Sequence, residues 1–145
     1  MKIKKIVALT AACAMLSSTA GCQIITIDGE GTAEVGENGV VGNGAIGLSV
    51  STLNNPFFVS LAEGAQAEAE EKGAELIMVD AGDDAAKQTN DVEDLISRNV
   101  SVLIVNPVDS DAVAPAVKDA ISKGIKVISV DRVVNGVDVD CQIAS

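Results

Sequence analysis

From Ala45 onward, short apolar runs alternate with segments of helical period in this 145-residue chain. Apolar runs without polar alternation are typical of parallel strands that are buried on both faces. The intervening segments repeat apolar residues every three to four positions, as amphipathic helices do. The pattern therefore predicts an α/β fold, a three-layer αβα parallel sheet. The apolar runs are Ala45–Val50, Glu75–Val79, Val102–Val105, Ile125–Val130 and, with a weaker pattern, Val137–Ile143.

The predicted helices carry start and stop signals. Asn55 can cap a helix whose first residue is Pro56, where the missing N–H has no partner to lose. Pro115 would break a helix interior, so it marks the start of the third helix. Gly73 and Gly124 suit the left-handed position after a helix. The inward faces should hold Phe58, Leu61, Ala62, Ala65 and Ala69, then Ala85, Val92, Leu95 and Ile96, then Val113, Ala116, Val117, Ala120 and Ile121.

Residues 1–21 have the composition of an export signal. Three lysines precede an apolar stretch, Ile6–Leu16, and small residues follow it. This stretch is too short to span a bilayer permanently, which takes about 20 residues. Thr19-Ala20-Gly21-Cys22 resembles a bacterial lipobox, which predicts a lipid on Cys22 and a protein anchored to the outer face of the cytoplasmic membrane. An ordinary cleaved signal followed by an incidental cysteine is the alternative.

Residues 22–44 differ sharply in composition from the segments on either side of them. They are rich in glycine and acidic residues and hold no periodicity, so they are predicted to form a Gly-rich tether between the lipid and a domain at 45–145. Within that domain Cys141 is the single cysteine, which leaves no internal disulfide. The chain has no histidine, and the cysteine spacing gives no support to a metal site.

The charge of the chain excludes several partners. Removing the signal takes away three lysines and no acidic residue, so the formal net charge moves from −11 to −14. A domain this acidic is repelled by phosphate backbones, and no basic stripe offsets that repulsion, so nucleic acid is not an expected partner. The charge also opposes flat binding to anionic lipid, which leaves the predicted lipid anchor as the contact with a membrane.

Aromatic and polar side chains follow two of the predicted strands. Asn55, Phe57 and Phe58 come after the first strand, and Asp131 and Arg132 end the fourth. Ligands of open parallel sheets bind at the carboxyl ends of the strands. Two rings beside an Asp–Arg pair suit a small polar ligand with an apolar face, such as a sugar. In the alternative interpretation, one or both rings plug the end of the core, and the Asp–Arg pair is a local ion pair or turn cap.

The remaining strand ends indicate no chemistry. Asp80 and Asn106 follow the second and third strands and are predicted as turn residues that make local side-chain hydrogen bonds. The acidic pair Asp83-Asp84 lies at a predicted helix start, where it complements the helix dipole. No phosphate-binding glycine loop follows the first strand, and no nucleophile elbow is present. The sequence therefore favours a binding protein over an enzyme, and no cofactor is expected.

Three stretches resemble the N-terminal half of ribose-binding proteins, the solute receptors of sugar ABC importers. They are Ser51–Phe58, Asn106–Asp111 and Val127–Arg132, and the resemblance extends over essentially all of 45–145. It implies the N-terminal lobe of a type I periplasmic-binding-protein fold, a ribose-like monosaccharide as ligand and the membrane subunits of an ABC permease as partners. It also implies that Asn55, Phe57, Phe58, Asp131 and Arg132 contact the sugar.

Members of that family have two similar lobes, joined by three crossing strands, with the sugar closed between them. The resemblance implies that this chain would first cross toward a second lobe where it ends, at Ser145. The sequence is thus expected to be a truncated substrate-binding component. A single non-binding structural or interaction lobe, dependent on a separately encoded second lobe, remains the alternative.

Overall fold

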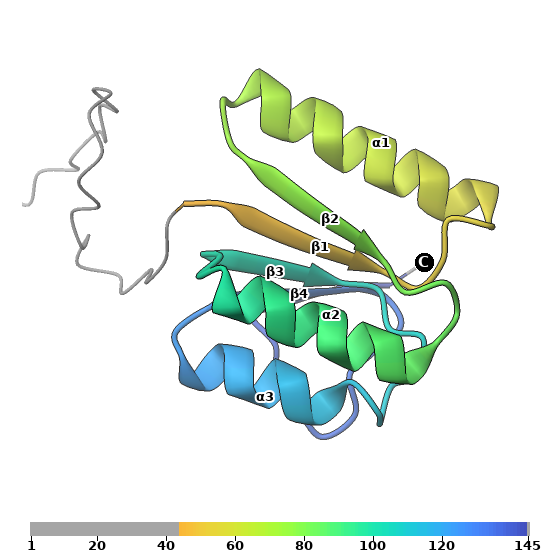
Figure 1. Ribbon diagram of the computed structural model, residues 1–145, viewed down its shortest axis with the longest axis vertical. Helices are drawn as coiled ribbons and strands as arrows, with labels where there is room; N and C mark the ends of the chain where they lie inside the picture. The colour runs from red at the N-terminus through yellow and green to blue at the C-terminus, as the bar shows by residue number, and fades with distance from the viewer. Residues whose placement is uncertain (1–43, 145) are drawn as a thin grey trace, which may run out of the picture. The chain divides into compact units, whose positions relative to one another are not determined.

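A computed structural model describes residues 44–144 of the chain. The predicted signal, most of the predicted tether and the lipidation candidate Cys22 lie outside these residues. Strands and helices alternate along the described part (Figure 1). Their bounds are β1 Ile46–Val50, α1 Pro56–Glu71, β2 Leu76–Asp80, α2 Ala85–Ser97, β3 Val102–Val105, α3 Ala114–Ser122, β4 Lys126–Asp131 and β5 Cys141–Ala144.

The strands form one parallel sheet in the order β2-β1-β3-β4-β5. This confirms the predicted parallel α/β architecture. The central strand β3 pairs with β1 on one side and β4 on the other, and Val105 lies in register with both Ser49 and Ser129. The carboxyl ends of β1, β3 and β4 therefore lie at the same edge of the sheet.

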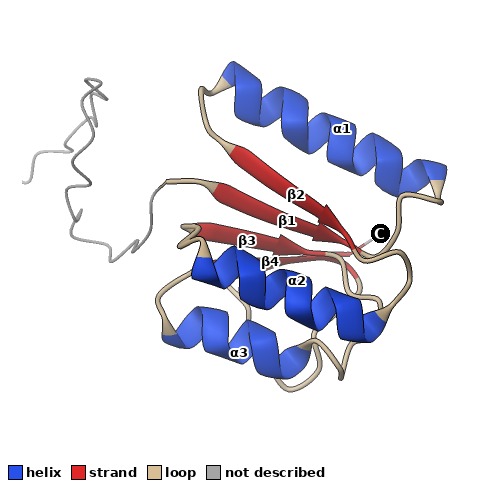
Figure 2. Cartoon of the chain, in the orientation of Figure 1, coloured by secondary structure: helices blue, strands red, loops and turns tan. Residues whose placement is uncertain are grey.

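Helices cover both faces of the sheet, with α1 on one and α2 and α3 on the other (Figure 2). Alternate residues of β1 show the two directions. Leu48 and Val50 are fully buried in a small core with Ala62 of α1. Gly47 faces α2, where the side chain of Leu95 lies so close that an added Cβ would meet its methyl carbons at 3.1 and 3.2 Å. The larger core lies between the sheet, α2 and α3.

The helix boundaries agree with the signals in the sequence. Asn55 caps α1 by accepting a 3.0 Å hydrogen bond from the Phe57 N–H, and Pro56 is the first helical residue. Pro115 lies in the first turn of α3. Gly73 and Gly124 adopt φ of +68° and +81° directly after the caps of their helices, a conformation open to glycine at little cost. These predictions are confirmed.

The fifth strand differs from the prediction. Its expected range is Val137–Ile143, whereas the structure has a strand only at Cys141–Ala144. Val137 and Val139 are half-buried against the larger core from a connecting segment. Their alternation with polar residues therefore reflects a loop lying on the core, not a strand in the sheet.

Asp140 holds this connecting segment in place. Its carboxylate accepts a 2.9 Å hydrogen bond from the Val127 N–H and another of 2.9 Å from the Lys126 ammonium. The Val127 bond, followed by the lysine, lowers the pKa of the Asp140 carboxyl. Both donors belong to the start of β4, so β5 enters the sheet from a fixed point beside its neighbour.

Among residues 44–144, no helix has the length and apolar character that crossing a bilayer requires.

Candidate functional site

The strand order places a candidate binding edge at the ends of β1 and β3. The chain leaves β1 toward β2 on one side and then returns to β3 on the other side. In sheets of this order, the connections diverge at that point and leave a crevice in which ligands bind. The carboxyl ends of the strands and the start of α1 lie at the same end of the sheet (Figure 1). β1 and β4 flank β3, so their ends are about 10 Å apart, two strand spacings.

The two phenylalanines differ in exposure, which bears on whether each ring is available to a ligand or fills the core. Phe58 is buried at 6% exposure, whereas Phe57 is 53% exposed. Their ring centroids are 5.3 Å apart with an interplanar angle of 72°, an edge-to-face contact. The core-plug interpretation therefore fits Phe58, and only Phe57 offers a large accessible ring surface at this edge.

Asn55 is exposed beside these rings. Its side-chain oxygen caps α1 through the Phe57 N–H. Since capping uses the oxygen, the amide NH₂ is the group that retains donors for a ligand. Asn55 thus combines a structural role with a position suited to hydrogen bonding.

Asp131 ends β4 in an unusual backbone conformation. Its φ is +68°, and the next residue, Arg132, donates its N–H to the Val130 carbonyl at 2.8 Å. A bond across three residues with positive φ at the centre is a γ-turn of the rare, strained kind. Such conformations persist where neighbouring contacts impose them, and they cluster at ligand clamps.

Arg132 lies against the loop after β3. Its Nη1 donates to the Val108 carbonyl at 2.8 Å and to the Pro107 carbonyl at 3.3 Å. Ser129 in turn donates its hydroxyl to the Arg132 carbonyl at 2.5 Å. Both guanidinium bonds use Nη1, and the guanidinium has five N–H donors. The loop therefore orients the side chain while its fork retains donors for a ligand.

The two predicted turn residues behave as structural groups. One carboxylate oxygen of Asp80 accepts from the Leu53 N–H at 3.2 Å and from the Gly82 N–H at 2.9 Å. Asn106 is fully buried. Its Oδ1 accepts from the Ser51 N–H at 3.1 Å and the Ser51 hydroxyl at 2.5 Å, and its Nδ2 donates to the Val130 carbonyl at 3.1 Å.

Gln88 of α2 is a buried partner of this edge that sequence reasoning misses. It is 1% exposed. Its Nε2 donates to the Asn106 carbonyl at 2.8 Å and to the Ser49 hydroxyl at 3.2 Å, and its Oε1 accepts from the Val108 N–H at 2.7 Å. Gln88 lies four residues before the buried Val92, so its helical spacing already places it on the inward face.

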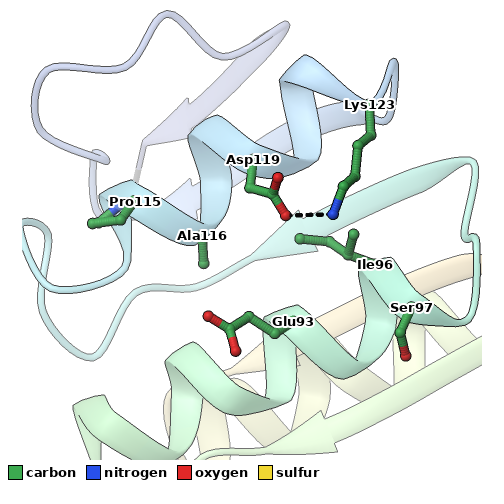
Figure 3. A pocket seen from close by; sticks show the side chains of 7 residues that line it. All are labelled: Glu93, Ile96, Ser97, Pro115, Ala116, Asp119 and Lys123. Atoms are coloured by element: carbon green, nitrogen blue, oxygen red, sulfur yellow. Dashed lines mark hydrogen bonds and ion pairs between the residues drawn. The ribbon is translucent and has the colours of Figure 1, made fainter.

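A groove between α2 and α3 lies away from this edge (Figure 3). It encloses about 450 Å³ on the helix layer. Asp119 of α3 and Lys123, which caps the end of that helix, form a 2.7 Å ion pair, with Glu93 of α2 opposite (Figure 3). None of the five predicted sugar-contacting residues lines it, so it is not the candidate site.

The sheet order and the residues at its carboxyl edge define a lobe of the type I periplasmic-binding-protein fold. The family model described as "Periplasmic binding protein domain" matches residues 46–145. The chain therefore belongs to this family.

The relatives are sugar-import binding proteins. The chain is 51% identical over 100 residues to the ribose import binding protein RbsB of Bacillus subtilis, covering 69% of this chain and 33% of that protein. It is 49% identical over 100 residues to RbsB of Escherichia coli, covering 69% and 34%. The chain thus spans about a third of the length of the curated relatives it matches.

Solved structures agree with this assignment. An ABC transporter solute-binding protein from Mycobacterium smegmatis with bound glycerol matches with a TM-score of 0.61 at 48% identity, over 63% of this chain and 32% of that one. The Caulobacter myo-inositol binding protein bound to myo-inositol matches with a TM-score of 0.64 at 33% identity, over 68% and 34%. The relatives are transport binding proteins, and their family is one of exported proteins.

Proposed function

We propose that this chain supplies one side of a monosaccharide-binding cleft in the substrate-binding component of a sugar ABC importer, with ribose or a similar sugar as ligand. The observation that carries the proposal is the placement of two short segments, here called arms, on either side of β3. Asn55 and Phe57 follow β1 and form the β1 arm, whereas Asp131 ends β4 and forms the β4 arm with Arg132, the next residue. The identity to ribose import binding proteins supports ribose as the first ligand to test.

The chemistry of the two arms fits a sugar. The exposed ring of Phe57 offers an apolar face to the C–H groups of a sugar ring. Each sugar hydroxyl both donates and accepts, and the Asp131 carboxylate accepts while the Arg132 fork donates. Phe58 is proposed to act by supporting Phe57, because its own ring is buried.

The experiment is a titration of the full chain with D-ribose, followed by NMR of the aromatic rings. Phe57 and Phe58 are the only aromatic residues in the chain, so the ring resonances are free of overlap from other residues. We expect ribose to shift the Phe57 ring more than the Phe58 ring. Phe57→Ala should weaken binding about fivefold or more, since a lost aromatic contact is worth roughly 1 kcal/mol.

Val133→Ala is the matched control for this titration. Val133 is also 53% exposed and lies beside the β4 arm, but it is not among the proposed sugar contacts. Its replacement should leave ribose binding unchanged. Ring resonances that ignore ribose, D-xylose and D-glucose alike would reject the sugar-binding proposal and favour the non-binding interaction lobe.

We also propose that Cys22 carries the lipid that holds the protein at the membrane. The support is the export-signal pattern that precedes it in the sequence. Cys22→Ser should move the protein from the membrane fraction to the soluble fraction or block its processing, as measured by fractionation and mass spectrometry. Cys141→Ser is the control, because Cys141 is a free cysteine within the folded part. Unchanged membrane association of Cys22→Ser would refute lipidation.

A further inference from the structure

We propose that Asn106 and Gln88 form a buried positioning pair that holds the two arms of the binding edge in one geometry. Both side chains lie beneath the edge, and neither is among the proposed sugar contacts. The inference rests on the proposed function for its effect on sugar affinity. Its effect on the geometry of Asp131 and Arg132 is measurable without any ligand.

Asn106 bridges the arms from the end of the central strand. Its Oδ1 accepts from the backbone N–H and the hydroxyl of Ser51, which begins the loop to Asn55 and Phe57. Its Nδ2 donates to the carbonyl of Val130, the residue before Asp131. One partner is an obligate donor and the other an obligate acceptor, so the amide has a single orientation that satisfies both.

The bond to Val130 bears directly on the strained turn. The Val130 carbonyl accepts from both the Arg132 N–H and Asn106 Nδ2. Asp131 lies between Val130 and Arg132 with φ of +68°. A left-handed residue that is not glycine needs its surroundings to impose that conformation. Asn106 supplies one such constraint at the carbonyl that closes the turn.

Gln88 constrains the loop after β3, against which the side chain of Arg132 lies. It donates to the Asn106 carbonyl and accepts from the Val108 N–H. The carbonyl of Val108 accepts from Arg132 Nη1. Gln88 therefore sets the position of a loop that in turn orients the guanidinium. Every buried side-chain polar atom of the described residues has a partner, so removing one member leaves others unsatisfied.

Asn106→Asp in the full chain is the most direct test. The substitution preserves shape and the acceptor for Ser51, but at alkaline pH its ionised carboxylate places an oxygen without a proton against the Val130 carbonyl. We expect the ³J(HN–Hα) coupling of Asp131 to change and the Arg132 amide to exchange faster by about tenfold, with ribose binding weakened about tenfold, because the Val130 carbonyl loses a donor that helps to hold the turn. The Phe57–Phe58 ring contact should persist.

Gln88→Met is the second variant, for use if Asn106→Asp fails to fold. It leaves the side-chain bonds of Asn106 in place. It should change the Nε–H resonance and exchange of Arg132 and weaken ribose binding by several-fold. Arg132→Lys tests the proposed sugar contact of Arg132 separately from the positioning of the turn at Asp131. It should weaken binding while the Asp131 coupling stays at its wild-type value, because the backbone bonds of the turn remain.

Val92→Ala is the matched control for a loss of stability alone. Val92 is fully buried on α2 one turn after Gln88 and lies outside the polar network. It should lower the melting temperature yet leave the Asp131 coupling, the Arg132 exchange and ribose affinity of the folded protein unchanged.

The outcomes separate the two proposals. Wild-type Asp131 and Arg132 signals in folded Asn106→Asp and Gln88→Met would overturn the positioning role, whatever the melting temperature. A wild-type chain that fails to bind ribose, D-xylose and D-glucose alike would reject the proposed function, while the changes in coupling and exchange would still establish the positioning role.

Discussion

Ribose should bind the full chain with a Kd of about 1 mM or weaker, which corresponds to about −4 kcal/mol. The proposed contacts cover one side of the sugar: Phe57 on its apolar face, and Asn55, Asp131 and Arg132 at its hydroxyls. The entropic cost of immobilising the sugar is nearly the same as in a closed cleft, whereas the favourable contacts are fewer. Isothermal titration calorimetry or the NMR titration measures this constant directly.

A chimera should restore tight binding. It joins this chain to the remaining two thirds of the Bacillus subtilis relative, which the match does not cover. If that part closes over the sugar, as the resemblance to two-lobed receptors implies, the Kd should fall about a thousandfold to the micromolar range, near −8 kcal/mol. Water is then excluded, and each hydrogen bond strengthens.

Two substitutions test whether the gain in ribose affinity of the chimera depends on Asp131 and Arg132. Asp131→Ala or Arg132→Ala in the chimera should remove about 10- to 100-fold of the affinity, because each deletes a charge-assisted hydrogen bond worth about 1.5–3 kcal/mol. Val133→Ala should leave the affinity intact. Micromolar binding by the chain without the added part would contradict the one-sided site and indicate two copies around the sugar or a different ligand.

Leu103→Ala should destabilise the fold more than any surface change. Leu103 is fully buried at the centre of the larger core, on the middle strand of the sheet. Truncating such a leucine costs about 2–5 kcal/mol, against the roughly 5–15 kcal/mol that typically separates folded from unfolded states. The melting temperature should fall by roughly 10–20 °C or more at about 4–8 °C per kcal/mol, as measured by circular dichroism.

Ile143→Ala is the control for this measurement. Ile143 belongs to the outer strand β5 and is 53% exposed, so its truncation should change stability by about 0.5 kcal/mol or less. A comparable loss in both variants would show that β5 packs against something in solution that covers its side chains.

The strands that are buried on both faces were predictable from the sequence, because their apolar runs leave few other options. β1, β3 and β4 begin and end within one residue of expectation. The helix starts at Pro56 and near Pro115 were also predictable, since proline is tolerated there and not further along. Local stereochemistry thus determined most of the boundaries.

The fifth strand was misplaced for a tertiary reason. Val137 and Val139 alternate with polar residues as a strand would, yet they pack on the core from a loop. What fixes them there is Asp140, through bonds to the start of β4. A long-range contact of this kind leaves no periodic mark in the sequence.

The polar network under the site was only partly predictable. Asn106 is expected from sequence to make local turn bonds, whereas its partners lie on Ser51 and Val130 of two other segments. Gln88 escapes a sequence-based core list because a polar side chain on an inward helical face is usually excluded from it. Its spacing places it inward, but only the fold shows which strand ends it joins.

The edge-to-face pair of Phe57 and Phe58 has a consequence for the entropy of recognition. An exposed ring normally loses rotational freedom when a ligand settles on it, which reduces affinity. Here the buried ring restricts the exposed one beforehand, so that loss occurs during folding and not during binding. Under the proposed function, a substitution of Phe58 would therefore affect both the stability of the fold and the recognition of the ligand.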